Sequence, residues 1–342
     1  MAGLPIGVAV VGAGMAGEAH AQAFRSAGMH PGLQDDGVEL VAVVDTDHER
    51  ARAVARKYGY RRALADLAEL EADGGVQAVA VALPNDRYAD VVPRLLAAGK
   101  HVLAEKPLAL SLDDARSMVA ACESAGVVMA TNHHLPASPT HRALKRAVRE
   151  GAVGDVRAVR VHHAVQLSER LAGWRIDDPE GGGVVLDVTV HDAAAVAAIL
   201  GTAGRSVMAV GLNQDNDPGG PFDAVMTSIE WEGGVLVQTH DAYNNPHLPT
   251  SLHVLGTEGA LVAEDCNTGD PVGSVTVWRD HKAEPVDVGP RDDVYEVTVR
   301  AFGAAVAGEG DVVVSGPDGV RSLAVSLAAL ESLRTGARAL VG

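Results

Sequence analysis

A glycine-rich turn near the start of the chain constrains the fold more than any other segment. It follows the apolar run Ile6–Val11 and precedes an alanine-rich stretch that is suited to a helix. The turn consists of Gly12, Ala13, Gly14, Met15, Ala16 and Gly17. In such a strand–turn–helix unit the first glycine permits the turn, the second lets a pyrophosphate approach, and the third allows close helix packing. The segment therefore predicts a dinucleotide-binding β-α-β unit.

An acid closes the second predicted strand, which is the apolar run Leu40–Val44. This residue, Asp45, can accept hydrogen bonds from both ribose hydroxyls of an adenosine. Asp45 lies 28 residues after Gly17, whereas the usual spacing is about 20. The intervening loop Gly28–Gly37 accounts for the excess. Because a carboxylate repels the 2′-phosphate of NADP, Asp45 predicts NAD as the preferred cofactor.

Arg50 leaves NADP open as an alternative cofactor, because an arginine at this place can accommodate a 2′-phosphate. The competing interpretation makes Arg50 a solvated helix residue that pairs with Asp47 or Glu49. Helical spacing favours that second interpretation.

Strands and helices alternate up to residue 131, with further buried strands expected at 78–83, 101–104 and 127–131. Such alternation predicts an α/β fold with a parallel, doubly wound Rossmann sheet. From residue 132 onward strand follows strand, which predicts an α+β domain with a largely antiparallel open sheet. We therefore expect a dinucleotide-binding domain over 1–131 and a substrate-binding and oligomerisation domain over 132–342. The last helices are expected to cover the second sheet or to return to the first domain.

Composition excludes several classes of partner and site. The 342 residues include 28 basic and 45 acidic ones, a formal charge of −17 that disfavours nucleic acid and anionic membranes. The two cysteines, Cys122 and Cys266, indicate a reducing compartment rather than a disulfide scaffold. With no signal peptide or membrane span in the pattern, we expect a cytoplasmic protein.

A lysine follows the predicted strand at 101–104, in the tripeptide Glu105-Lys106-Pro107. Ligands of open α/β sheets bind at the carboxyl ends of the strands, so Lys106 is a candidate for the site. On the tripeptide alone, a surface lysine at a strand end is the favoured interpretation.

A second candidate pair follows the glycines 181–183. Asp187 and His191 are spaced i and i+4, so on one helix face they can touch the same ligand, and the acid can set the tautomer of the histidine. The alternative is a helix N-cap beside a surface histidine. Histidines also occur as His133-His134 and His162-His163, but none shows a spacing diagnostic of a metal, so no catalytic metal is expected.

Taken in order, five stretches resemble the signatures of the glucose-fructose oxidoreductase and inositol dehydrogenase family. They are Val10–Gly17, Leu83-Pro84-Asn85, Ala98–Pro107, Gly181–Gly183 and Asp187–His191. The resemblance implies a Rossmann domain, a C-terminal α+β domain whose open sheet builds homodimers or homotetramers, and an active site between the two. It also implies hydride transfer between a nicotinamide and a hydroxyl or ketone of a sugar or polyol.

Further stretches resemble a sugar ketone reductase of that family, which uses NADPH and has no acid at the position of Asp45. These stretches are Thr131–Leu135, Gly173–Asp177, Val190–Ala193, His240–Tyr243, Gly256–Gly259 and Val294–Glu296. The chain departs from the family pattern at Pro136–Ser138 and at Tyr88, where many relatives have histidine.

The motifs and the resemblance together define the predicted site. The catalytic residues are Lys106, Asp187 and His191. The residues expected at the cofactor are Gly12, Gly14, Met15, Ala16, Gly17, Asp45, Thr46, Arg50, Leu83, Pro84, Asn85, Tyr88, Glu105, Lys106, Trp174 and Arg175. Those expected at the substrate are Lys106, Asn132, His133, His134, Asp187, His191 and Tyr295.

Two other functions remain as alternatives. The first is an NAD-dependent glycosidase of the same family that oxidises, eliminates and reduces within one turnover. The second is a non-catalytic regulator that keeps the dinucleotide fold.

Overall fold

The computed structural model describes residues 5–28, 37–217 and 219–342. The chain divides into two compact units, one formed by Met1–Asn132 with Tyr295–Pro317 and the other by His133–Val294 with Asp318–Gly342. Each unit is described by itself. The loop predicted over Gly28–Gly37 lies largely outside the described residues.

The first unit holds a six-stranded parallel sheet, as the alternating pattern predicts. The strand order is β3-β2-β1-β4-β5-β6. The strands are β1 (Ile6–Val11), β2 (Val38–Val44), β3 (Arg62–Leu64), β4 (Ala78–Val81), β5 (His101–Glu105) and β6 (Met129–Asn132). The order reverses between β1 and β4, which is where an open α/β sheet binds its ligand.

Helices cover both faces of this sheet, and its two central strands β1 and β4 are apolar throughout. The helices are α1 (Met15–Gly28), α2 (His48–Tyr58), α3 (Leu67–Glu71), α4 (Tyr88–Ala97), α5 (Leu112–Ala125), α9 (Val294–Val306) and the 3₁₀ turn η1 (Asn85–Arg87). Val10 and Leu103 are completely buried, and they share a core with Phe24 and with Phe302 of α9. The chain therefore returns to the first unit after it has built the second.

The second unit is built on a nine-stranded sheet in the order β14-β13-β12-β11-β7-β10-β9-β8-β15. The strands are β7 (Val156–Ala164), β8 (Gly204–Leu212), β9 (Ala224–Trp231), β10 (Val235–Ala242), β11 (Ser251–Gly256), β12 (Ala260–Glu264), β13 (Ser274–Arg279), β14 (Lys282–Val286) and β15 (Ala339–Leu340). Neighbouring strands are antiparallel except β7 and β10, which run parallel. The expected mostly antiparallel sheet is confirmed. The pattern did not predict β14 or β15.

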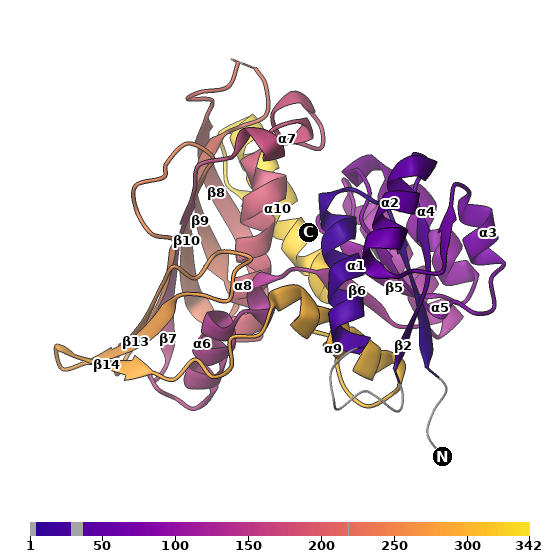
Figure 1. Cartoon of the computed structure of the whole chain (residues 1–342). Coiled ribbons are helices and arrows are strands. Elements are labelled where there is room, and N and C mark those ends of the chain that lie inside the picture. The colour runs from indigo at the N-terminus through magenta and orange to yellow at the C-terminus, as the bar shows by residue number, and fades with distance from the viewer. Residues whose placement is uncertain (1–4, 29–36, 218) are drawn as a thin grey trace. The chain divides into compact units, whose positions relative to one another are not determined.

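Three longer helices, α6 (Pro139–Arg149), α8 (Val190–Leu200) and α10 (Gly316–Thr335), lie on one face of this sheet (Figure 1). Leu144, Val196 and Val325 from these helices share a core with the sheet residues Val237 and Val254. The shorter elements are α7 (Trp174–Asp177), the 3₁₀ turns η2 (Leu135–Ala137), η3 (Glu169–Leu171) and η5 (Glu232–Gly234), and the π-helical turn η4 (Val185–Thr189). The opposite face of the sheet exposes large apolar side chains.

One predicted element differs in kind. One α-helix was expected to carry both Asp187 and His191. Asp187 instead lies in the π-helical turn η4, where the Val190 amide bonds to the Val185 carbonyl, and α8 begins only at Val190. A π turn inserts a residue into the helix, so an i and i+4 pair does not stack as it does in an α-helix.

No helix in the described part of the chain is long and apolar enough to cross a membrane.

Candidate active site

The glycine-rich turn has no room for side chains at two of its three glycines. Gly12 has a φ of +95°, and a Cβ atom there would lie 2.0 Å from the Ala82 carbonyl oxygen. A Cβ on Gly17 would lie 1.7 Å from the carbonyl oxygen of Gly12. At Gly14, in contrast, a Cβ would meet nothing within 4 Å. The backbone at Gly14 therefore faces open space at the start of α1, which fits the approach of a pyrophosphate to the helix N-terminus.

Asp45 is oriented by the backbone of this turn. Its Oδ2 accepts a hydrogen bond from the Ala13 amide at 2.7 Å, and its Oδ1 accepts one from the Asp47 amide at 2.8 Å. A carboxylate has four lone pairs, so it can still accept ribose hydroxyls. Thr46 is exposed beside it. Arg50 lies 3.3 Å from Asp47, which is the pairing that the helical spacing indicates.

The stretch after β4 shapes the other side of this edge. Pro84 is exposed, Leu83 is half-buried and Asn85 is buried. Tyr88 is completely buried, and its hydroxyl accepts from the Leu83 amide at 3.2 Å and donates to the Val81 carbonyl at 3.4 Å. The Tyr88 side chain therefore has no surface to offer a cofactor. It holds the turn that carries Leu83 and Asn85.

Glu105, at the end of β5, is the centre of a buried polar cluster. Its Oε1 accepts hydrogen bonds from His20 Nε2 at 2.9 Å, from Asn132 Nδ2 at 2.5 Å and from the Tyr295 hydroxyl at 3.5 Å. Burial by itself would raise the pKa of Glu105, but the bonds from His20 and Asn132 and the charge of Lys106 lower it overall. The carboxylate is therefore ionised, and it accepts the Lys106 amide at 3.3 Å on its other oxygen.

This cluster joins three predicted site residues, Glu105, Asn132 and Tyr295, in the first unit. It also contains His20, which the sequence reasoning missed. His20 lies in α1 and is completely buried, with its ring edge-on to the Tyr295 ring at 5.1 Å. A lone histidine in an alanine-rich helix just after a glycine turn was the available signal. Lys106 itself is half-buried at the carboxyl edge of the sheet.

In the second unit, Asp187 is held by two donors. Its Oδ2 accepts from Arg175 Nε at 2.7 Å and from the Tyr243 hydroxyl at 2.9 Å. Burial and the nearby charge of Asp187 raise the pKa of Tyr243 well above its ordinary value, so its hydroxyl remains a donor. Arg175 Cζ also lies over the Trp174 ring, 4.5 Å from the ring centroid, and Trp174 is 39% exposed. Arg175 and Trp174, predicted at the cofactor, are thus connected to Asp187.

His191 is buried among other histidines. Its Nδ1 is hydrogen-bonded to His133 Nδ1 at 3.3 Å. The centroids of the His134 and His191 rings are 4.4 Å apart, and the two ring planes make an angle of 63°. That Asp187 can set the tautomer of His191 stays a prediction. Asp187 lies in the π-helical turn before α8, and one hydrogen-bond partner of His191 is His133.

Asp192, the residue after His191, and Asp241 are both completely buried carboxyl groups. Burial raises the pKa of Asp192 to about 7, and burial together with the nearby Asp192 raises the pKa of Asp241 well above its usual value. His163 Nδ1 lies 2.7 Å from Asp192, and the Thr189 hydroxyl donates to Asp241 at 2.5 Å. Such a network gives α8 a fixed position on β7 and β10.

Within the described ranges, no three histidine, cysteine or acidic side chains are placed to hold a metal ion together.

Comparison with known proteins identifies the family. Residues 6–133 match the family described as "Oxidoreductase family, NAD-binding Rossmann fold", and residues 141–262 match the "GFO/IDH/MocA C-terminal domain". The chain is also 40% identical to the 1,5-anhydro-D-fructose reductase of Ensifer adhaerens over 305 residues, which is 89% of this chain and 91% of that protein. The chain belongs to the GFO/IDH/MocA oxidoreductase family. The expected family and its NAD-binding Rossmann domain are thereby confirmed.

Other members of the GFO/IDH/MocA family are similar over almost the whole chain. The myo-inositol 2-dehydrogenase of Thermotoga maritima is 26% identical over 95% of this chain and 96% of its own length. Among solved structures, levoglucosan dehydrogenase in complex with NADH and levoglucosan has a TM-score of 0.88, at 21% identity and with 99% of both chains covered. At that identity the likeness shows the fold alone.

Proposed function

We propose that this GFO/IDH/MocA oxidoreductase transfers a hydride between NAD(H) and a ketone or secondary hydroxyl of a sugar or polyol. The identity to the Ensifer reductase over nine tenths of both chains carries the proposal. The half-buried Lys106 after β5 and the buried Asp187 and His191 supply groups suited to this chemistry.

The bound nicotinamide supplies or accepts the hydride, and the protein moves the proton. During reduction, His191 donates a proton to the oxygen that becomes a hydroxyl. During oxidation, it accepts that proton, which suits an imidazole at neutral pH. Lys106 polarises the same oxygen through its positive charge. Asp187, held by Arg175 and Tyr243, has an orientation suited to accept a hydrogen bond from a second sugar hydroxyl.

We further propose that NAD(H) is preferred over NADP(H). Asp45 lies against the glycine-rich turn through the Ala13 amide, so its charge is placed where a 2′-phosphate would be repelled. Arg50, the group that could offset this repulsion, is paired with Asp47.

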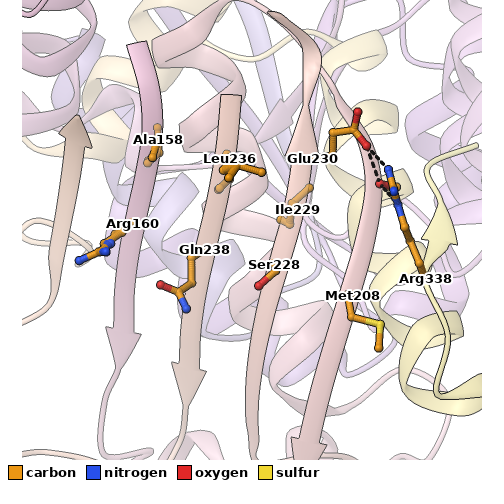
Figure 2. A pocket seen from close by; sticks show the side chains of 12 residues that line it. Ala158, Arg160, Met208, Ser228, Ile229, Glu230, Leu236, Gln238 and Arg338 are labelled. Carbon is orange, nitrogen blue, oxygen red and sulfur yellow. Dashed lines mark hydrogen bonds and ion pairs between the residues drawn. The ribbon is translucent and has the colours of Figure 1, made fainter. Parts of the chain in front are cut away.

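The outer face of the second sheet is proposed to pair with a second copy of the chain. Met208, Val210, Met226 and Leu236 on β8, β9 and β10 are 43–67% exposed. A hollow of about 450 Å³ lies on these strands. Figure 2 shows four of the residues that line it, which are Leu236, Met208 and the paired Glu230 and Arg338. Large apolar side chains exposed on three neighbouring strands of one sheet face are typical of an interface between copies.

The deciding experiment screens sugars, inositols and anhydro-ketoses with NAD(H) and NADP(H) while the absorbance of the reduced cofactor is followed. Steady, substrate-dependent turnover of the cofactor supports the proposal. Loss of an aglycone without net cofactor turnover would instead establish the glycosidase. Cofactor binding with no chemistry on any substrate would favour the regulator.

A further inference from the structure

A chain of hydrogen bonds runs from the backbone of α10 to His191. His191 Nδ1 is bonded to His133 Nδ1 at 3.3 Å, and His133 Nε2 is bonded to Ser322 Oγ at 3.0 Å. Ser322 Oγ in turn donates to the Gly319 carbonyl oxygen at 3.0 Å. All three side chains are at most 5% exposed. All the residues of this series of hydrogen bonds lie within the second unit.

The direction of this chain follows from counting protons. A carbonyl oxygen can only accept, so the single proton of the Ser322 hydroxyl points to Gly319. Ser322 Oγ must then accept its second bond from His133, which places a proton on His133 Nε2. Neutral imidazole carries one proton, so His133 Nδ1 has a lone pair.

The same count fixes the proton on His191. Because His133 Nδ1 is an acceptor, the bond between the two rings requires a proton on His191 Nδ1. The opposite direction would turn the proton of Ser322 toward His133. Two lone pairs, those of Ser322 Oγ and the Gly319 carbonyl, would then face each other at 3.0 Å inside the protein.

We propose that Ser322 and His133 are positioning residues that hold neutral His191 in the Nδ1–H tautomer, so that Nε2 is the nitrogen that exchanges the substrate proton. The part of this inference that concerns substrate rests on the proposed function. The nearby His134 ring supports the arrangement, because its contact at 4.4 Å restricts rotation of the His191 ring.

When His191 carries two protons, its Nδ1–H still donates to His133. This series of hydrogen bonds from Ser322 through His133 to His191, here called the relay, therefore keeps one geometry in both protonation states of His191. Proton transfer at His191 Nε2 then needs no reorientation of the ring. Since His133 is a neutral acceptor, it sets the tautomer without adding a full negative charge beside His191.

The tautomer can be measured without any substrate. In protein labelled with ¹⁵N-histidine, long-range ¹H–¹⁵N correlation spectra distinguish Nδ1–H from Nε2–H rings, and the spectrum of His191→Gln identifies the His191 signals. We expect neutral His191 to show the Nδ1–H pattern in the unmodified protein. An Nε2–H pattern in the folded protein would overturn the relay and would leave the hydride-transfer proposal untouched.

Variants separate the relay from general packing. Ser322→Ala is expected to give His191 a mixed tautomer pattern, whereas Ser326→Ala should leave the pattern unchanged. Ser326 is a matched control because it is a completely buried serine on the same helix. His133→Asn keeps an acceptor near the Nδ1 position and should retain the Nδ1–H pattern, whereas His133→Leu should lose it. Equal spectra for Ser322→Ala and the unmodified protein would contradict the role of Ser322.

A kinetic arm uses a substrate found in the screen. We expect Ser322→Ala to lower kcat roughly 2- to 10-fold, which corresponds to one neutral hydrogen bond, with little change in KM. Ser326→Ala should keep kcat. An unchanged kcat in Ser322→Ala, alongside an altered tautomer pattern, would show that the relay exists but that Nε2 is not the exchanging nitrogen.

Discussion

His20 Nε2 lies 2.9 Å from Glu105 Oε1, and this bond joins α1, which begins at the glycine-rich turn, to the strand end that precedes Lys106. An ionised carboxylate only accepts, so the His20 ring donates. The helix that follows the glycine-rich turn and the strand that precedes Lys106 are therefore held in one arrangement by a buried, charge-assisted bond.

This bond predicts a pH dependence of stability. The pKa of Glu105 is lowered in the folded state, so its stabilisation is present above the ordinary value of 4.5 and is lost as the pH falls through the folded pKa. Glu105→Gln should therefore lower the free energy of unfolding by about 2 kcal/mol at pH 7 and by less in acid. Urea denaturation at several pH values measures this. Glu123→Gln, at an exposed position on α5, is the control. If Glu105→Gln lowers the free energy of unfolding by the same amount at every pH down to about 3.5, the lowered pKa of Glu105 would be contradicted.

Asp45→Ser should change the choice of cofactor. Removal of its charge is expected to raise kcat/KM with NADP(H) relative to NAD(H) by roughly 10-fold or more. Asp66→Ser, which removes an exposed acid at the N-cap of α3, should leave the ratio unchanged. If the unmodified protein uses both cofactors equally and Asp45→Ser does not alter the ratio, the role would pass to Arg50.

Lys106→Ala should lose turnover while it keeps the cofactor, because we propose that the glycine-rich turn and Asp45, rather than Lys106, hold the dinucleotide. We expect kcat to fall by roughly 10²- to 10³-fold, the effect of removing a group that stabilises developing charge. Fluorescence titration with NADH should give a nearly normal Kd. Lys57→Ala, which removes a lysine on α2 of the same unit, serves as the control. A near-normal kcat would remove Lys106 from the catalytic set.

His191 should give opposite pH profiles in the two reaction directions. Oxidation needs it neutral and reduction needs it protonated, so the two kcat/KM profiles should bend in opposite senses. His191→Ala should lower the rate by roughly 10²- to 10⁴-fold and flatten both profiles. The exposed His247 offers a matched control in His247→Ala. An unchanged bend in His191→Ala would mean that another group, Lys106 first, moves the proton.

The outer face of the second sheet should govern the oligomeric state. Leu236→Glu places a charge on the exposed face of β10 and is expected to dissociate the assembly into single chains, as measured by sedimentation velocity. Leu248 is 60% exposed, close to the 66% of Leu236, and it lies in a loop outside the sheet. Leu248→Glu should therefore leave the oligomeric state unchanged. Identical sedimentation of both variants and the unmodified protein would argue against this interface.

The local parts of the fold and of the cofactor site could be read from the chain itself. The turn Gly12–Gly17 and the acid Asp45 follow from strand, turn and helix signals that lie close together in sequence. The pairing of Arg50 with Asp47 is local as well. In these cases backbone geometry over a few residues decides the arrangement, so the pattern is sufficient.

The partners of the catalytic candidates required the tertiary structure. His20 and Glu105 are 85 residues apart, and Ser322 and His133 are 189 apart. Tyr88 had the signal of a ligand residue but is completely buried under its own turn. His191 is hydrogen-bonded to His133, from which it lies 58 residues away in the chain. Side-chain hydrogen bonds between distant segments depend on how helices pack on the sheets, and local patterning carries no information about that packing. The sequence by itself therefore determined the kind of fold and the chemistry available, and the tertiary structure decided which group holds which.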